Sequence, residues 1–159
     1  MEFVHIGEGN REPVNSFLRT HWFTTDMVIR GVAVDLTRAE GFLSFGNDGE
    51  IDALITFIVT GGRCEITSLD SLASGRGTGT ALVRAVVETA RRRGCERVVV
   101  TTTNDNVKAI RFYQNRGFKI SNIYRDSLAA ARRIKPEIPE TGENGIPLRH
   151  EIELAMPLN

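Results

Sequence analysis

The clearest pattern along the chain is a series of three short apolar runs separated by turn residues. Residues 41–45 and 51–60 are rich in apolar and β-branched side chains, and the turn sequence Gly-Asn-Asp-Gly at 46–49 separates them. Glycine, asparagine and aspartate tolerate the positive φ angles of tight hairpin turns. A glycine pair at 61–62 then leads into a third run over 64–69. The pattern predicts three consecutive antiparallel strands.

Two helices and a central strand are predicted next. Over 80–93 apolar residues recur at i, i+3 and i+4, arginine and glutamate occupy the far side, and Gly94 fits the end of the helix. The run 97–102 is apolar on both faces, as in a central strand reached by a helical crossover, which predicts a parallel strand pair. A second helix is predicted over 107–116, ending at Gly117.

The two ends of the chain carry weaker signals, and residues 21–41 show no clean period. The elements predicted there are a strand over 2–6, a helix over 11–20 with Asn10 as its cap, a strand over 118–124, a helix over 128–134 capped by Asp126, and a final strand over 148–156. In the final strand apolar residues alternate with charged ones, so Glu151 and Glu153 fall on its polar face.

The composition is that of an ordinary globular protein. With 159 residues, 41% hydrophobic and 25% charged, the chain is long enough for one domain with a buried core. Lysine plus arginine and aspartate plus glutamate number 20 each, so no net charge attracts nucleic acid or an anionic membrane. No secretion signal or membrane-spanning run of ~18 apolar residues is present. We therefore expect a cytoplasmic protein with neither of those partners.

The two cysteines carry little chemistry by themselves. Cys64 and Cys95 are too few for a disulfide framework and lack the paired spacing of a zinc site. Both are predicted to be packed thiols, and no metal is expected.

The segment Ser-Gly-Arg-Gly-Thr-Gly-Thr at 74–80 lies between a predicted strand and a predicted helix. Alternating glycines let successive backbone N–H groups point into one concavity, and the helix dipole adds about half a positive charge. Arg76 can contribute a direct charge, which suits a diphosphate. A tight connection that binds nothing gives the same pattern. The Gly-Lys-Ser/Thr of a P-loop is absent, and the loop follows a meander, unlike a dinucleotide-binding fingerprint.

The loop and the next helix together resemble the GNAT superfamily of acetyl-CoA-dependent N-acetyltransferases. Residues 106–118, Asn-Val-Lys-Ala-Ile-Arg-Phe-Tyr-Gln-Asn-Arg-Gly-Phe, match the family pattern N-x-x-A-x-x-x-Y-x-x-x-G-F in full. The loop matches the diphosphate pattern at Gly77 and Gly79, but Ser74 stands where arginine or glutamine is usual, and Arg76 can replace that contact. The resemblance is strongest over 65–124.

The resemblance implies a mixed α/β fold in a single domain over 1–159, with a bent, mostly antiparallel sheet, a central parallel pair and helices on both faces. It implies acetyl-CoA as cosubstrate, bound between the strands of Glu65 and Val98, and direct transfer to a primary amine. The residues it implies for cofactor binding are Leu69, Asp70, Ser71, Ser74, Gly75, Arg76, Gly77, Thr78, Gly79, Thr80, Asn104, Asn106, Ala109 and Phe112. Relatives often form homodimers.

Acetyl transfer to an amine requires a neutral amine and an acid for the leaving thiol. A coenzyme thiol resembles cysteine, with pKa ~8.5, and a phenol of pKa ~10 can donate a proton or a hydrogen bond to it as it leaves. The resemblance assigns the role of general acid to Tyr113. Glu65 is the first candidate for the base, because the family often carries a carboxylate on that strand, and Asp70 is the second. Regular alternation puts Glu65, Thr67 and Leu69 on one strand face. The alternative for Glu65 is an exposed strand carboxylate without a catalytic role. The alternative for Asp70 is a turn or capping residue.

Two further points concern the acyl group and the acceptor. The resemblance implies that a backbone N–H near 69–71 polarises the acetyl carbonyl, where the family's strand separates from its neighbour. The acceptor, a small-molecule or peptide amine, is expected to contact the segments around 22–35 and 136–148, where Arg30 and Arg149 are candidates for holding an acceptor carboxylate or for simple surface ion pairs. The rival functions are a non-catalytic acyl-CoA sensor of the same fold and a regulatory domain that binds ATP.

Overall fold

Antiparallel strand pairing organises most of the chain in the computed structural model, which describes residues 2–22, 25–72 and 76–158. The chain forms two compact units: Met1–Asp26, Asp35–Val98 and Leu158–Asn159 make the first, and Met27–Val34 and Val99–Pro157 make the second. The glycine loop belongs to the first unit and the Asn106–Phe118 motif to the second. The prediction that residues 1–159 form a single domain concerns how these two units assemble. It stays a prediction.

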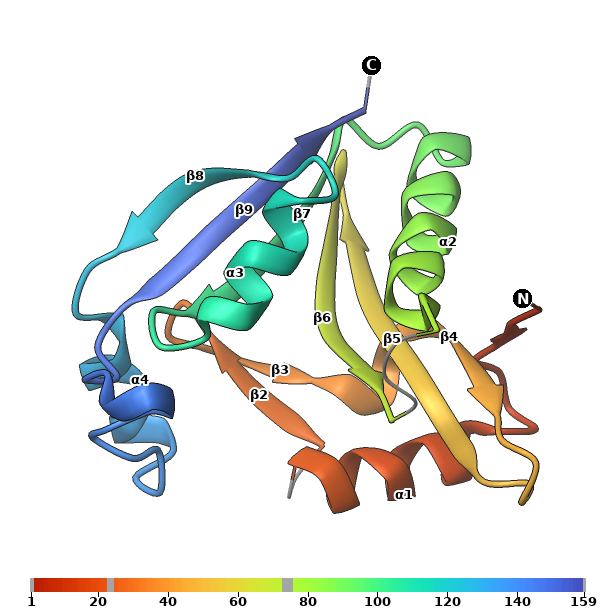
Figure 1. Ribbon diagram of the computed structural model, residues 1–159, viewed down its shortest axis with the longest axis horizontal. Helices are drawn as coiled ribbons and strands as arrows, with labels where there is room; N and C mark the ends of the chain where they lie inside the picture. Colours follow the sequence, from red (N-terminus) through yellow and green to blue (C-terminus); the bar gives the residue numbers. More distant parts are fainter. Residues whose placement is uncertain (1, 23–24, 73–75, 159) are drawn as a thin grey trace. The chain divides into compact units, whose positions relative to one another are not determined.

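The first unit is built on a four-stranded antiparallel sheet (Figure 1). Its elements are β1 (Val4–His5), α1 (Arg11–Trp22), the 3₁₀ helix η1 (Leu36–Arg38), β4 (Glu40–Phe45), β5 (Ile51–Thr60), β6 (Arg63–Ser71) and α2 (Thr78–Arg92). The strand order is β1-β4-β5-β6, so the predicted meander is confirmed. The helix α1 extends to Trp22, two residues beyond its predicted end.

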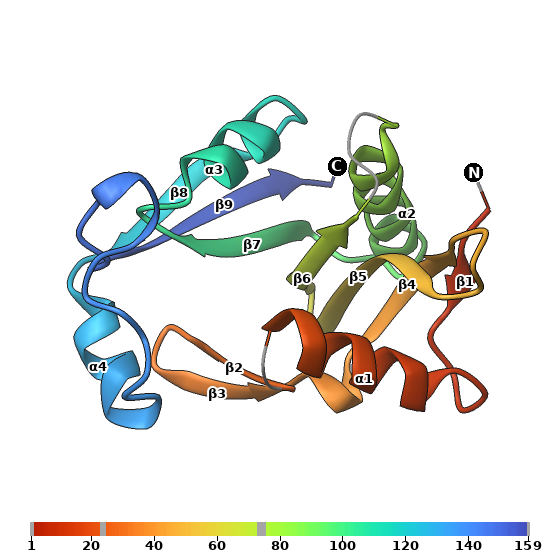
Figure 2. The ribbon, with the colours of Figure 1, turned by 60° about the horizontal axis from the view of Figure 1, so that its bottom comes forward.

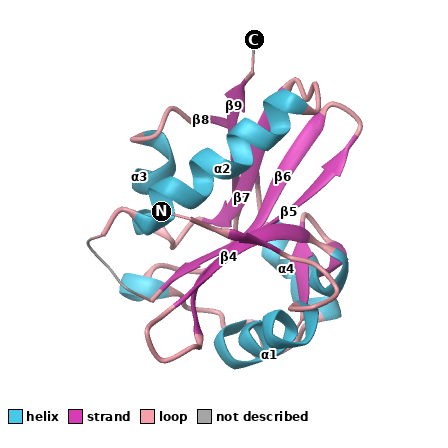
Figure 3. Cartoon of the chain, turned by 90° about the vertical axis from the view of Figure 1, so that its right-hand side faces the viewer, coloured by secondary structure: helices cyan, strands magenta, loops and turns pink. Residues whose placement is uncertain are grey.

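The helices α1 and α2 cover opposite faces of this sheet (Figures 2 and 3). Their apolar stripes are buried: Val14, Phe17 and Leu18 in α1, and Leu82, Val83, Val86, Val87 and Ala90 in α2. Between them, β5 supplies Leu54, Ile55 and Phe57, each at most 2% exposed. Because both faces of β5 are covered, this strand reads as a continuous apolar run.

A β-bulge in the middle of β6 changes which side chains share a face. Phe57 of β5 pairs with Ile66, but the preceding Thr56 pairs with Ser68, so Thr67 is the additional residue. The Thr56 hydroxyl forms hydrogen bonds with the hydroxyls of Thr67 at 2.7 Å and Ser68 at 2.5 Å. These three buried hydroxyls satisfy one another inside the core, where an unpaired polar group would cost free energy.

The bulge makes the expectation of regular alternation wrong beyond Ile66. Side chains that pair directly across two antiparallel strands share a face, and Asp70 pairs with Leu54 while Glu65 pairs with Ile58. Leu54 and Ile58 lie on the same face of β5 because they are four residues apart. Asp70 therefore joins the face of Glu65, and Leu69 lies on the opposite one.

The second unit contains a three-stranded sheet and a two-stranded ribbon. Its elements are the ribbon β2 (Asp26–Ile29) and β3 (Val32–Asp35), then β7 (Arg97–Thr103), α3 (Val107–Gln114), β8 (Lys119–Tyr124), α4 (Ser127–Ile134), the short helix η2 (Glu143–Gly145) and β9 (Glu151–Pro157). In the sheet, β9 lies between β7 and β8 and pairs antiparallel with β8. The helix α3 packs on β8 and β9 (Figure 1).

One local expectation needs correction in this unit. Asp126 precedes α4, but it adopts a left-handed conformation (φ 57°) and its side chain makes no capping hydrogen bond. Instead, its backbone N–H donates to Nδ1 of His150 at 2.9 Å. The segment 21–41, which shows no period, contains the end of α1, the β2–β3 ribbon and η1. The predicted mixed α/β class, with mostly antiparallel strands and helices on the sheet faces, is confirmed.

Candidate active site

The start of α2 presents backbone N–H groups at the glycine loop. Gly77 precedes the helix in the left-handed conformation (φ 71°), which a glycine adopts without a Cβ penalty, and this N-cap residue supplies no side-chain cap of its own. The first helical hydrogen bond runs from Ala81 N to Gly77 O. The N–H groups of the first turn have no partner within a helix, so a helix that begins this way suits an anion.

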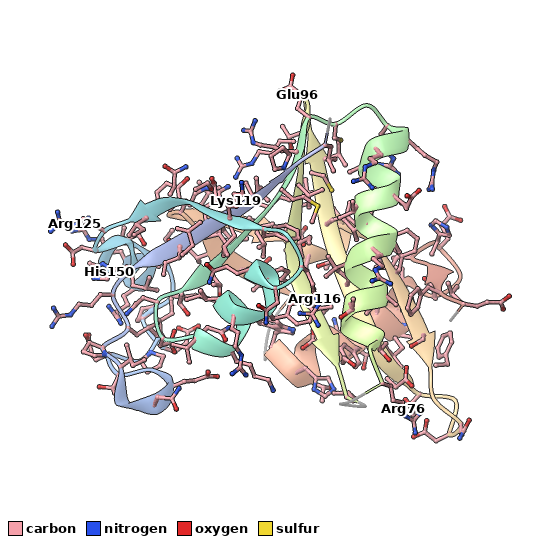
Figure 4. The ribbon with its side chains drawn as sticks, turned by 45° about the horizontal axis from the view of Figure 1, so that its top comes forward. Arg76, Glu96, Arg116, Lys119, Arg125 and His150 are labelled. Carbon is pink, nitrogen blue, oxygen red and sulfur yellow. The ribbon has the colours of Figure 1, made fainter. Side chains whose placement is uncertain are left out.

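The predicted loop residues lie around this helix start. Thr78, Gly79 and Thr80 form its first turn, and the exposed Arg76 precedes it, near the end of α2 that the glycine loop enters (Figure 4). Ser74 and Gly75 lie outside the described residues. Among the described loop residues, Arg76 is the cation that the sequence predicts beside a diphosphate.

The carboxyl group of Asp70 lies near the C-terminal end of β6, on the face covered by α1. Its Oδ2 accepts a hydrogen bond of 2.7 Å from Nε1 of Trp22. Within the described part of the chain, its Oδ1 accepts no hydrogen bond. Burial raises the pKa of Asp70, while the Trp22 hydrogen bond and the charge of His21 act in the opposite direction. A carboxylate with a raised pKa is a better proton acceptor near neutral pH.

Glu65, the other predicted base, has a different environment. It forms an ion pair with Arg63, at 3.5 Å between Nη2 and Oε2, and the two side chains are 15% and 28% exposed. The Glu65 carboxylate is therefore engaged by a cation, whereas Asp70 is engaged by a neutral indole N–H. Five residues of strand, on the order of 15 Å, separate Glu65 from Asp70 along β6.

The backbone of Leu69 and Ser71 stays paired with β5. Leu69 pairs with Ile55 and Ser71 pairs with Ala53, and the N–H of Leu72 donates to Asp52 O at 2.8 Å. Pairing on the β5 side therefore continues to the very end of β6. An amide that polarises the acetyl carbonyl has to come from the other edge of the strand, and that assignment stays a prediction.

The family motif in the second unit forms α3. Asn106 caps this helix, because its Oδ1 accepts a hydrogen bond from the N–H of Ala109 at 3.1 Å. Gly117 ends it with φ 94°, and the N–H of Phe118 returns to Tyr113 O at 3.1 Å. The side-chain oxygen of Asn106 is thus used for the helix cap. Its amide nitrogen is a separate group, so the cap is compatible with the predicted contact to acetyl-CoA.

Tyr113 is the buried residue of α3, at 5% exposed. Its ring makes edge contacts with Phe112 and Phe118, with centroids 5.1 and 5.3 Å apart. The guanidinium of Arg116 lies 3.7 Å from the Phe112 centroid and donates to Phe112 O at 2.8 Å. Aromatic packing thus fixes the position of the Tyr113 phenol.

Two side chains after β7 hold the segment before β9. Asn104 donates to Pro147 O and accepts from the N–H groups of Arg149 and His150. The buried Asp105 accepts from Thr103 Oγ1 and from the N–H of Glu143. Asn104, predicted to contact the cofactor, therefore orders part of the segment 136–148 that the sequence assigns to the acceptor.

Gly142 contacts this anchor so closely that no side chain fits. A Cβ atom there would lie 2.8 Å from Cβ of Asp105 and closer still to its carboxylate. We expect Gly142→Ala to lower the free energy of unfolding by about 1–3 kcal/mol, measured by chemical denaturation. Gly9→Ala is the control, because a Cβ at Gly9 meets no atom within 4 Å, and its effect should stay within about 0.5 kcal/mol. Equal stability of the two variants would contradict the tight packing.

Buried glutamates in β9 are a feature that the alternating pattern missed. Glu151 and Glu153 are 4% and 7% exposed, although both were expected on a polar face. Both oxygens of Glu151 accept from the backbone N–H of Arg30, and Glu153 accepts from Ser121, Asn122 and Tyr124. The Arg30 guanidinium donates to Thr101 Oγ1 at 2.8 Å. Arg30 is thus engaged inside this unit, unlike a surface ion pair.

The remaining candidate groups have restricted chemistry. Burial raises the pKa of the Cys64 thiol to about 12, so Cys64 is a poor nucleophile. Among the described residues, no group of three or more histidine, cysteine, aspartate and glutamate side chains could hold a metal ion. Within the same described ranges, no helix has the length and apolar character to cross a membrane.

Comparison with known proteins identifies the family. The model of the acetyltransferase (GNAT) family matches residues 12–118. The chain belongs to this family, and it is an acetyltransferase. The resemblance stated from the loop and the Asn106–Phe118 motif is therefore confirmed.

Similar proteins include a curated relative and two solved structures that are named as acetyltransferases. The uncharacterized protein YdhI of Bacillus subtilis is 43% identical over 152 residues, covering 96% of this chain and 95% of the relative. An IAA acetyltransferase from Bacillus cereus has a similar structure, with 30% identity, TM-score 0.66, and coverage of 77% of this chain and 80% of that one. A GNAT acetyltransferase from Elizabethkingia anophelis with acetyl-CoA bound has 27% identity, TM-score 0.64, and coverage of 77% and 78%.

Proposed function

We propose that this acetyltransferase transfers the acetyl group of acetyl-CoA directly to a primary amine. The start of α2 after Gly77 is the single observation that carries the proposal, because a helix N-terminus preceded by a left-handed glycine offers a helix dipole and backbone N–H groups to a diphosphate. The full match of residues 106–118 to the family's helix motif supports acetyl-CoA as the donor. The homologue with bound acetyl-CoA adds to this support.

Residues Gly77–Thr80 and Arg76 bind the diphosphate in this proposal, and Asn106, Ala109 and Phe112 line the path of the pantetheine arm. Tyr113 protonates the thiolate as it leaves. The phenol suits this step because, with a pKa of ~10, it carries its proton at pH 7 and can donate it, or a hydrogen bond, to the thiolate as the C–S bond breaks; the phenoxide then recovers a proton from solvent. The inert, buried Cys64 agrees with transfer that involves no acyl-enzyme.

Asp70 is the base in this proposal, in preference to Glu65. Asp70 lies at the end of β6 from which the chain continues into the glycine loop. Glu65 lies near the start of β6 and is paired with Arg63. A free amine with pKa ~10.4 is almost entirely protonated at pH 7, so a carboxylate that accepts its proton accelerates transfer. Burial raises the pKa of Asp70 toward that task.

Purified protein tests the proposal directly. Acetyl-CoA is expected to raise the melting temperature in a concentration-dependent way, while ATP leaves it unchanged. Thiol release from acetyl-CoA is then measured with a panel of spermidine, tyramine, L-lysine and an alanine-initiated tripeptide, and the acetylated product is identified by mass spectrometry. Stabilisation without thiol release from any amine would favour the acyl-CoA sensor, and stabilisation by ATP alone would reject the donor site.

A further inference from the structure

Trp22 and Asp70 are separated by 48 positions in the sequence but joined by one short hydrogen bond. Trp22 is the last residue of α1, and its indole Nε1–H donates to Oδ2 of Asp70 at 2.7 Å. Since α1 covers the sheet face to which the bulge brings Asp70, the contact depends on both elements. A hydrogen bond of this length to a carboxylate belongs to the stronger, charge-assisted kind.

The indole N–H acts on both the geometry and the ionisation of the carboxyl group. It engages one oxygen, so the carboxyl plane has a defined orientation and Oδ1 is the oxygen outside this bond. An indole N–H is a donor only, so it stabilises the carboxylate more than the neutral acid.

The surroundings of the carboxyl group add one further charge. His21 lies in the same turn of α1 and acts in the same direction as the indole, while the residue paired with Asp70 across the sheet is the apolar Leu54. Burial acts in the opposite direction. Removing the indole donor should therefore let burial raise the pKa of Asp70 further.

We infer that Trp22 is a positioning residue for acetyl transfer: its indole N–H orients the carboxylate of Asp70 and keeps it in the proton-accepting form. The inference rests on the proposed function, in which Asp70 is the base. It extends that function to a residue that does not touch the reacting atoms. The orientation of the base then depends on the end of α1, and no sequence motif indicates this link.

The single tryptophan of the chain makes this contact directly observable. The protein gives one indole N–H resonance, which is followed by ¹H–¹⁵N NMR from pH 4 to pH 9. In a His21→Gln background, which removes the neighbouring imidazole, the resonance should titrate with a midpoint above the ordinary aspartate pKa. In His21→Gln/Asp70→Asn this titration should be absent. A resonance that titrates identically in both proteins overturns the contact.

Kinetics tests the role of the contact in the reaction. The variants Trp22→Phe, Asp70→Asn and the double variant are assayed between pH 5 and pH 9 with acetyl-CoA and the panel amine that gives the fastest thiol release. The plot of log kcat/KM against pH already rises as the amine substrate loses its proton. Below the pKa of the base, protonation of the base makes this plot steeper by one unit of slope. Trp22→Phe should move the start of this steeper limb upward by about one pH unit, so kcat/KM below it falls about tenfold while kcat/KM at pH values above it changes little.

The controls separate positioning from structural damage and from a wrong base. In the Asp70→Asn background, Trp22→Phe should change kcat/KM by less than about twofold, because the group it acts on is gone. An equal loss at every pH in both backgrounds overturns the inference and leaves Trp22 a packing residue. If Asp70→Asn retains full activity and the steep limb, the proposed base has failed, whereas loss of the limb in Asp70→Asn with no shift in Trp22→Phe rejects the inference alone.

Discussion

Asp70→Asn is expected to lower kcat/KM by about 10²–10³-fold, because general-base catalysis contributes on this scale. Asparagine has nearly the same shape, and its carbonyl oxygen can still accept the hydrogen bond from Trp22, so the fold and the end of α1 are retained. Only the ability to take a proton is removed. The measurement is the rate of thiol release with the best panel amine, together with the melting temperature of the variant.

The matched control for this prediction is Glu65→Gln, on the same face of the same strand. Because Glu65 is paired with Arg63 and lies near the start of β6, its amide variant should lose less than about tenfold in kcat/KM. The reverse ranking, with a large loss for Glu65→Gln and little for Asp70→Asn, would transfer the role of base to Glu65.

The pH profile of the wild type carries the same information. Burial raises the pKa of Asp70, and a base must be deprotonated, so the steep acid limb should begin above the ordinary aspartate pKa. Activity is gained as pH rises through this pKa and lost as pH falls through it. The limb should be absent in Asp70→Asn.

Tyr113→Phe is the second large effect. It should lower kcat by about 10²-fold or more, because the leaving thiolate loses its proton donor, while the affinity for acetyl-CoA stays nearly unchanged. Phenylalanine retains the edge contacts with Phe112 and Phe118, so α3 should keep its position. Rapid-mixing measurement of thiol release separates kcat from acetyl-CoA binding.

Tyr124→Phe provides the control, since Tyr124 is the other tyrosine of the chain and its hydroxyl donates to Glu153 in the second unit. Its removal should affect stability more than kcat, because a buried carboxylate loses one donor. Comparable losses of kcat in both variants would argue against a specific role for the Tyr113 hydroxyl.

Much of the fold followed from the sequence because it depends on near neighbours. The hairpin turn at 46–49, the periodicity of α2 and the glycine stop after α3 are properties of a few consecutive residues, and each produced the expected element. The loop around Gly77 and the motif from Asn106 to Phe118 are local too, so they sufficed to indicate the family. No element could be predicted over segment 21–41, because its ribbon is held by contacts with distant residues, such as the hydrogen bonds from Arg30 to Glu151.

The orientation of side chains on β6 and β9 was decided only by tertiary structure. Regular alternation placed Asp70 on the strand face opposite to Glu65. The bulge at Thr67, whose hydroxyl is hydrogen-bonded to that of Thr56 on the neighbouring strand, exchanges the two faces for the residues that follow. The same alternation placed Glu151 on a polar face, yet the backbone N–H of Arg30 donates to both of its carboxylate oxygens in a buried position. A residue's own sequence neighbours cannot specify a partner that folding brings from 121 positions away.

The sequence by itself therefore determined the class of reaction, because a diphosphate loop and a helix motif are short and contiguous. Tertiary structure decided which carboxylate we propose as the base. That choice depends on burial, on the end of α1 and on a bulge set by strand pairing, and each of these arises from contacts between segments distant in the chain.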